Sequence, residues 1–167
     1  MTIRQAQAFF GLVLCSIFVM TTNTAAAQDL NIPDETVNLL PGPTIGYGWR
    51  DGDAGGLILG AEVSVAYANL DEFVWAGFYS DLTYDFGGDS LRLSLGPEFG
   101  FSFFGFDAGL MVDDIFGGSP ELGLSVRPVL SIFGVFSIYS RFTSGNEFAT
   151  SFELGVTGKF PVPLDDR

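Results

Sequence analysis

Histidine is absent from this 167-residue chain and basic residues are scarce, since seven Lys and Arg stand against twenty Asp and Glu. Without histidine the chain lacks the usual general base of Ser-His-Asp and Cys-His sites and the commonest transition-metal ligand. The formal net charge of −13 leaves no basic surface for a phosphate backbone, which excludes nucleic-acid binding. The single cysteine, Cys15, cannot form an internal disulfide. We therefore expect neither an enzyme nor a bound cofactor.

The first 27 residues have the pattern of an export signal. Arg4 and the amino terminus supply positive charge, Ala8 to Met20 is apolar apart from one serine, and Ala25 to Ala27 offer a small-residue cleavage site. The apolar stretch is shorter than the roughly 20 residues of a bilayer-spanning helix. Lipid attachment at Cys15 is disfavoured because the apolar run continues on both sides of it. Residues 1–27 are predicted to be a cleaved signal peptide, so the protein is exported.

Beyond Pro41, apolar residues alternate with polar or small ones, which is the period of a β-strand with two different faces. Between Leu91 and Phe103, for example, Leu93 lies on one face while Arg92 and Glu98 lie on the other. Eight segments show this pattern: 45–50, 57–67, 74–86, 91–103, 104–113, 121–131, 135–142 and 148–160. The chain is therefore predicted to be all-β with eight strands.

The connections between these segments are of two kinds. Longer, acidic ones follow the odd-numbered segments, at 50–56, 85–89, 113–120 and 143–147. Tight ones follow the even-numbered segments, at 69–72, 103–104 and 133–134. An up-and-down meander places the two kinds at opposite ends, as in membrane-spanning barrels with short turns at one end and longer loops at the other. The predicted fold is an eight-stranded antiparallel up-and-down transmembrane β-barrel.

Side-chain size decides which face is outside. The interior of an eight-stranded barrel is only just wide enough for its side chains, so the face rich in Phe, Leu, Tyr and Val is expected to contact lipid. The other face is rich in Gly and Ser and carries the basic residues, which can pair there with carboxylates. We predict a charge network in the lumen: Arg92, Arg127, Arg141, Lys159, Glu62, Asp81, Glu98, Asp107 and Glu153. The alternative is a soluble, lipocalin-like barrel that buries its apolar face around a ligand.

The last predicted strand carries a possible assembly signal. Glu153, Gly155 and the closing Phe160 resemble the signal read by the barrel-assembly machinery. Over Pro43 to Phe160, the chain resembles the small eight-stranded bacterial outer-membrane barrels of the OmpA/OmpX and OmpW kind. The resemblance implies the outer membrane of a Gram-negative bacterium, contact with its lipid and lipopolysaccharide, and two periplasmic termini. Residues 28–42 are then a periplasmic lead-in or partial plug, 43–160 the barrel, and 161–167 a short periplasmic tail.

The expected role is structural or interactive, in the cell envelope. A narrow, low-conductance, porin-like channel is the alternative, because small interior residues leave room for water, although charged pairs would fill much of it. The outer-membrane enzymes that this chain resembles use histidine, which it lacks. Carboxylates in flexible loops suit hard cations, so weak candidates for divalent cations shared with lipopolysaccharide are Asp51, Asp53, Asp89, Asp113 and Asp114. The plain alternative is that these carboxylates are simply solvated.

Overall fold

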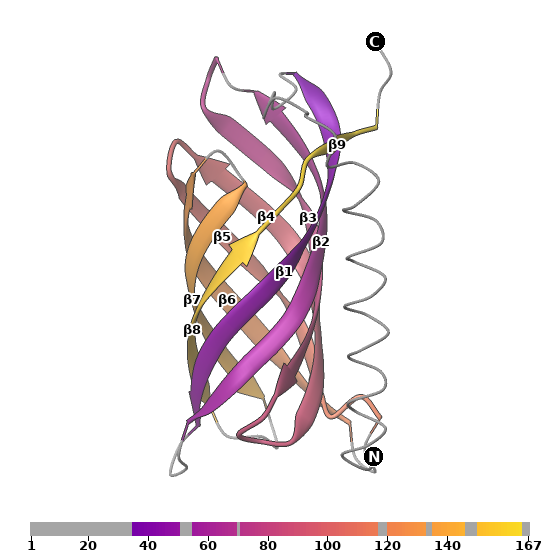
Figure 1. The fold of residues 1–167 in the computed structure, drawn as a ribbon, viewed down its shortest axis with the longest axis vertical. Coiled ribbons are helices and arrows are strands. Elements are labelled where there is room, and N and C mark those ends of the chain that lie inside the picture. The colour runs from indigo at the N-terminus through magenta and orange to yellow at the C-terminus, as the bar shows by residue number, and fades with distance from the viewer. Residues whose placement is uncertain are drawn as a thin grey trace. The chain divides into compact units, whose positions relative to one another are not determined.

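A computed structural model of the chain describes residues 35–50, 55–69, 71–116, 120–132, 135–145 and 150–164. The predicted signal peptide, residues 1–27, lies outside these ranges. The strands follow one another along the chain (Figure 1): β1 (Thr36–Arg50), β2 (Gly56–Asn69), β3 (Val74–Asp85), β4 (Ser90–Phe101), β5 (Phe104–Asp113), β6 (Glu121–Ile132), β7 (Phe136–Gly145), β8 (Ser151–Gly158) and β9 (Val162–Pro163). The described residues contain no helix that is long and apolar enough to cross a membrane.

The strands form one closed sheet. Each strand from β1 to β7 pairs antiparallel with the next, and β8 pairs with β1, from Thr44 opposite Thr157 to Arg50 opposite Ser151. Closure leaves no free edge along the paired length of the wall. The prediction of an all-β, eight-stranded, up-and-down barrel is confirmed, and each of the eight predicted segments corresponds to one of the strands β1 to β8.

The wall begins earlier than the sequence analysis placed it. Strand β1 starts at Thr36, and residues 36–42 pair with β2 down to Gly42 opposite Glu62. This part of the expected 28–42 lead-in is therefore barrel wall, while residues 28–34 lie outside the described part. The pattern was hidden because Leu39 and Leu40 are adjacent apolar residues, and because Pro41 and Pro43 are atypical of a strand.

The expected tail at 161–167 is also part of the sheet up to Leu164. Strand β1 extends past the end of β8, and the short β9 covers that extension, with Val162 opposite Leu39. The Phe160 and Leu164 amides donate to the carbonyls of Pro41 and Val37 at 2.9 Å each. Figure 1 shows β9 lying across the upper part of β1. An otherwise open strand edge is thus covered by the chain's own carboxyl-terminal segment.

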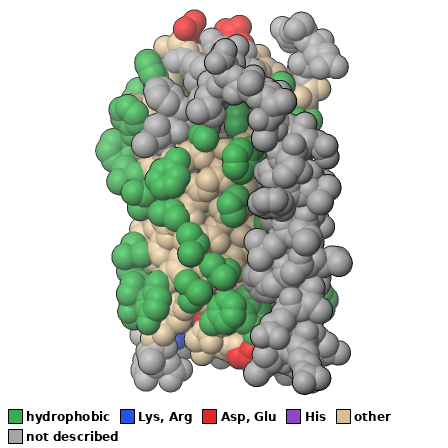
Figure 2. Space-filling view, in the orientation of Figure 1, with side chains coloured by type: hydrophobic (Ala, Val, Ile, Leu, Met, Phe, Trp, Pro, Cys, Tyr) green, Lys and Arg blue, Asp and Glu red, His purple; other side chains and the backbone are tan. Residues whose placement is uncertain are grey.

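The two faces of the wall differ in chemistry. Large apolar side chains point outward, and Phe78 and Phe104 are 69% and 68% exposed. Figure 2 shows such side chains scattered over the height of the barrel, with the acidic groups visible in that view confined to its two ends. Most of the fully buried side chains are polar or charged. In a soluble protein the large apolar side chains are mostly inside and the charged ones outside, so the two faces are reversed here.

Candidate functional site: the barrel interior

All nine side chains predicted to form the lumen network point inward and are at most 7% exposed. They come from seven strands and from the residue just after β8. Side chains alternate between the faces of a strand, so each charged residue shares the inner face with Gly, Ser or Thr neighbours two positions away. The structure therefore places the predicted charges together inside the wall.

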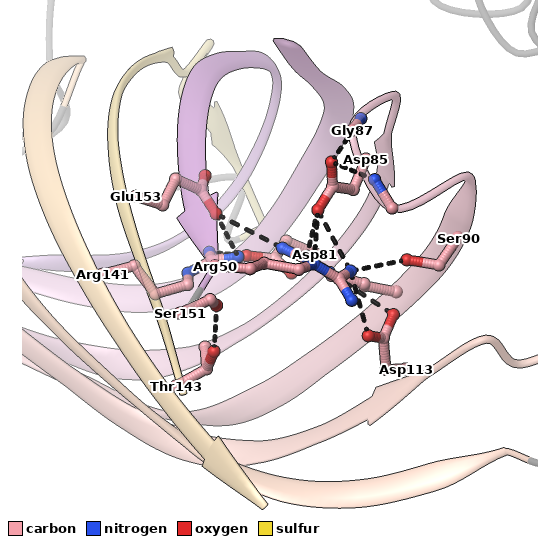
Figure 3. A network of polar contacts seen from close by, with 12 residues as sticks. Arg50, Asp81, Asp85, Gly87, Ser90, Asp113, Arg141, Thr143, Ser151 and Glu153 are labelled. Atoms are coloured by element: carbon pink, nitrogen blue, oxygen red, sulfur yellow. Dashed lines mark hydrogen bonds and ion pairs between the residues drawn. The ribbon is translucent and has the colours of Figure 1, made fainter. Parts of the chain in front are cut away.

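A four-charge cluster closes the end of the interior that carries the longer loops. Arg50 donates to the Oδ2 atom of Asp85 at 3.1 Å and to the Ser90 hydroxyl at 3.0 Å, and it pairs with Asp113 at 3.2 Å. Arg92 also pairs with Asp85, and its Nε lies 3.4 Å from Asp113. Figure 3 shows Asp85, Ser90 and Asp113 converging from neighbouring strands. Two arginines and two carboxylates thus balance one another here.

Arg141 lies deeper and is fully buried. It donates to Asp81 on the opposite side of the lumen, and its Nη1 lies 3.9 Å from Glu153. Glu153 also accepts a hydrogen bond from the Tyr139 hydroxyl. Figure 3 shows Arg141 and Glu153 reaching from their strands toward Asp81. These contacts tie β3, β7 and β8 together across the interior.

Arg127 contacts three carboxylates of the described interior. It pairs with Glu62, with Asp107 at 2.6 Å and with Asp81 at 3.5 Å. Its guanidinium also lies 4.8 Å from the ring centre of Tyr79, within cation–π range. Asp107 is its direct partner across β5 and β6, whereas Glu62 is on β2. Arg127 therefore connects strands that share no backbone pairing.

Lys159 completes the network at the end with the short turns. Its ammonium lies 2.6 Å from Glu62, 2.9 Å from Glu98 and 2.8 Å from the Ser64 hydroxyl. Lys159 follows directly after β8, and its amide donates to the Val135 carbonyl at 2.6 Å. The position of this charge thus depends on where β8 ends.

An aromatic side chain fills the interior beside this last group. Trp75 on β3 lies over Gly100 and Gly105, where any Cβ atom would overlap its indole ring. In the same way, the Tyr139 ring occupies the space beside Gly155. The interior glycines thus make room for large rings, and their positions are set by close approach rather than by turns.

The ion pairs form a continuous chain along the lumen. Arg92 links the loop-end cluster to Glu153 at 4.0 Å, and Arg141 and Arg127 both contact Asp81. Glu62 then joins Arg127 to Lys159. Buried charges are tolerated only when they are paired and hydrogen-bonded. Chemically, this arrangement holds the wall in one register and fills the lumen with side chains.

Several interior residues were not among the predicted site residues. Asp85 pairs with two arginines, Arg50 belongs to the loop-end cluster, and Tyr79, Tyr139 and Trp75 fill space in the interior. The alternation that identified the other charges also places these five on the inner face. They were not named as site residues from the sequence, because Asp85 also begins the predicted 85–89 connection and because small residues and charged pairs, not large rings, were expected to fill the lumen.

The loop carboxylates predicted as candidates for divalent cations have different surroundings in the structure. Asp51 and Asp53 lie outside the described residues. Asp113 is engaged by Arg50 and Arg92 as described, and Asp89 accepts a hydrogen bond from the Tyr84 hydroxyl. The described ranges contain no group of three or more His, Cys, Asp or Glu placed to hold a metal ion.

Asp114, the remaining loop candidate, follows Asp113 directly, and its amide donates to the Asp113 carboxylate at 3.1 Å. The three residues of the expected assembly signal lie on β8 and just after it. Glu153 points into the lumen, Gly155 lies beside the Tyr139 ring, and Phe160 is exposed on the outer face.

Comparisons with known proteins return few matches. No family model matches the chain, and no curated protein sequence matches it. Among solved structures, a designed transmembrane β-barrel shares 10% identity with a TM-score of 0.47, over 77% of this chain and 98% of that one. Ail, the attachment invasion locus protein of Yersinia pestis, shares 13% identity with a TM-score of 0.35, over 77% of this chain and 100% of that one. The fold therefore rests on the strand pairing described above.

Proposed function

We propose that this protein is an integral outer-membrane β-barrel with a structural or interaction role in the cell envelope, its lumen filled by ion pairs. One observation carries the proposal: a closed barrel presents large apolar side chains outward and buries its charges inside. Water would favour the opposite arrangement. A hydrocarbon environment favours apolar side chains outside and charges inside. Closure of the barrel also satisfies the backbone hydrogen-bonding groups internally.

The dimensions of the wall support the same proposal. A strand that crosses a bilayer at a tilt needs roughly 9 to 11 residues. Strands β3, β4 and β6 have 12 residues each, and β5 and β7 have 10. Aromatic residues lie near the strand ends, as in the interfacial girdles of such barrels. Trp49 stacks on Phe152 at the loop end, and Phe101 and Phe104 are exposed at the turn end.

The filled lumen weighs against the channel alternative. Arg127 and Arg141 are buried in ion pairs in the middle of the interior, and Trp75 lies across the turn end. Ion flow would require several of these contacts to separate together. We expect planar bilayers containing the purified protein to show no conductance steps above baseline. Regular steps would favour a narrow pore instead.

The orientation and partners belong to the same proposal. Both described chain ends, Glu35 and Leu164, lie at the end of the barrel with the short turns, which would place that end in the periplasm. The loop end would face outward, toward lipopolysaccharide and its divalent cations, and the barrel-assembly machinery would insert the chain. A melting temperature that does not change on addition of calcium or magnesium would count against cation binding by the loops.

Cell fractionation followed by gel electrophoresis tests the proposal. We expect the protein in the outer-membrane fraction, with different gel mobility before and after boiling, because a closed barrel resists detergent until heated. A lipocalin-like barrel would instead remain in the soluble fraction without detergent. That outcome would mean that the outward apolar face is covered by something other than lipid.

A further inference from the structure

The described interior holds more negative than positive charge. Seven buried carboxylates face five cations: Asp85, Asp113, Glu62, Asp81, Glu98, Asp107 and Glu153 against Arg50, Arg92, Arg127, Arg141 and Lys159. The loop-end cluster is balanced, with two charges of each sign. The remaining five carboxylates therefore share three cations. An unpaired buried carboxylate is strongly unfavourable, so the folded barrel must take up positive charge from elsewhere.

The surplus is concentrated at one pair. Glu98 and Asp107 are direct partners across β4 and β5, where opposite side chains start about 4.5 to 5.5 Å apart. Each carboxylate uses one oxygen: Glu98 Oε2 accepts from Lys159 at 2.9 Å, and Asp107 Oδ2 accepts from Arg127 at 2.6 Å. The other oxygens, Glu98 Oε1 and Asp107 Oδ1, are buried without a hydrogen-bond partner among the described residues. Two like charges placed this way repel unless one is neutralised.

Two buried hydroxyls lie on the inner face beside Gly109 of β5. The Tyr79 hydroxyl lies 2.9 Å from where a Cβ atom of Gly109 would stand, two residues after Asp107 on the same inner face. Ser125 is the partner of Gly109 on β6. Tyr79 and Ser125 are 2% and 1% exposed, and neither hydroxyl has a hydrogen-bond partner within the described ranges. These hydroxyls bring no charge and cannot neutralise the surplus.

The other carboxylates of the lumen differ from this pair. Both oxygens of Glu62 are paired, one with Lys159 and one with Arg127. Near Arg141, the unpartnered buried atoms include its own Nε and Nη1 donors as well as acceptors of Asp81 and Glu153. Within the described interior, Glu98 and Asp107 are directly opposite carboxylates that each keep one oxygen without a hydrogen-bond partner, and neither of the cations that they contact has an unpartnered donor.

We propose that Glu98 and Asp107 bind one proton between them, so that a carboxylic acid donates a hydrogen bond to a carboxylate inside the barrel wall. The shared proton removes one of the two surplus charges and gives both free oxygens a partner. Two carboxylates that share a site commonly hold a proton in this way. The charged and titratable groups that surround the pair in the lumen are Glu62 from β2, Tyr79 and Asp81 from β3, Arg127 from β6, Tyr139 and Arg141 from β7, and Glu153 and Lys159 from β8 and its end.

Infrared spectroscopy of the folded full-length protein at neutral pH tests this directly. We expect the carbonyl stretch of a protonated carboxylic acid, shifted on transfer to D₂O and on isotopic labelling of Asp and Glu. The band should be lost in Glu98→Gln and in Asp107→Asn, because a single remaining carboxylate pairs with Lys159 or Arg127. It should remain in the control Glu153→Gln, a buried carboxylate that contacts Arg92 and Arg141 and neither of the cations of the pair. Gel mobility of the same samples shows that the barrel is folded, which keeps this test separate from the proposed function.

Unfolding in urea gives a second readout. Glu98→Gln and Asp107→Asn should leave the midpoint unchanged or raise it, whereas Glu62→Gln should lower it, because Glu62 compensates two cations. Absence of the acid band from the folded wild type overturns the proposal, and so does a band that persists in both pair variants. A midpoint that rises with sodium or calcium concentration, without an acid band, would identify a metal cation as the occupant and also overturn it.

Discussion

Replacing Arg127 by methionine removes a buried cation with three carboxylate partners in the described lumen while keeping most of the side-chain volume. Glu62 would still contact Lys159, and Asp81 would still contact Arg141. Asp107 would keep no ion pair. Removing one partner of a buried ion pair typically costs about 3 to 5 kcal/mol, because the other charge is left uncompensated. We expect Arg127→Met to lower the free energy of unfolding by about that amount.

Urea titration of the protein in detergent micelles or vesicles, followed by tryptophan fluorescence, measures this change. Both tryptophans report usefully, since Trp75 lies in the interior and Trp49 is 42% exposed on the outer face. The control is Val126→Leu, the outward-facing neighbour on the same strand, which should stay within about 0.5 kcal/mol of the wild type. Adding Asp107→Asn to Arg127→Met should restore about 0.5 to 3 kcal/mol, the range of coupling between contacting residues.

Two outcomes would refute the reasoning. A loss below about 1 kcal/mol for Arg127→Met would match a solvent-exposed ion pair and would mean that the lumen is open to water. A double variant no more stable than Arg127→Met alone would mean that the cost does not come from stranding Asp107. In either case the ion pairs would not hold the barrel in the way described.

Five further variants test three other parts of the structure, each by the same urea titration. Leu95→Arg, on the outer face near the middle of β4, should lower the free energy of unfolding in a bilayer by about 2 to 4 kcal/mol. Leu122→Arg, near the loop end of β6, should lower it by about 0 to 1 kcal/mol. Equal losses would argue against a lipid-facing wall. Gly105→Ala should lose about 1 to 3 kcal/mol through overlap with the Trp75 ring, while Gly158→Ala, whose Cβ would meet nothing within 4 Å, should be neutral. Ser102→Gly should gain about 1 kcal/mol, because Ser102 adopts a φ of 56° that glycine tolerates without strain; a loss would show that its side chain stabilises the turn.

The period-two pattern predicted the eight strands β1 to β8 and their inner and outer faces, because a closed barrel of this size repeats one rule along its whole wall. The pattern failed where prolines or a very short strand hid the alternation of apolar and polar residues. The start of β1 was missed because Pro41 and Pro43 read as strand breakers, and β9 was missed because two residues carry no periodic signal. Both errors fall where β1 extends beyond β8, a feature that only the pairing of distant segments reveals.

The sequence also predicted which charges lie inside, but not which of them meet. Some partners follow from register, such as Arg127 opposite Asp107 and Arg141 opposite Glu153. Others do not: Arg127 meets Glu62 on β2, and Arg141 meets Asp81 on β3, across the lumen and far along the chain. Those distances depend on how the strands tilt and stagger when the sheet closes, a property of the whole barrel that no local pattern carries.

The interior charges also explain why the strands keep one register. A slip of one residue would turn every inward side chain of a strand outward. For β4, such a slip would move Arg92 and Glu98 from their ion pairs into hydrocarbon, where a cation alone costs about 2 to 4 kcal/mol at mid-depth. An apolar interior would impose no such penalty, because both faces of the wall would then suit lipid. The ion pairs therefore contribute to specificity of pairing even where their net contribution to stability is small.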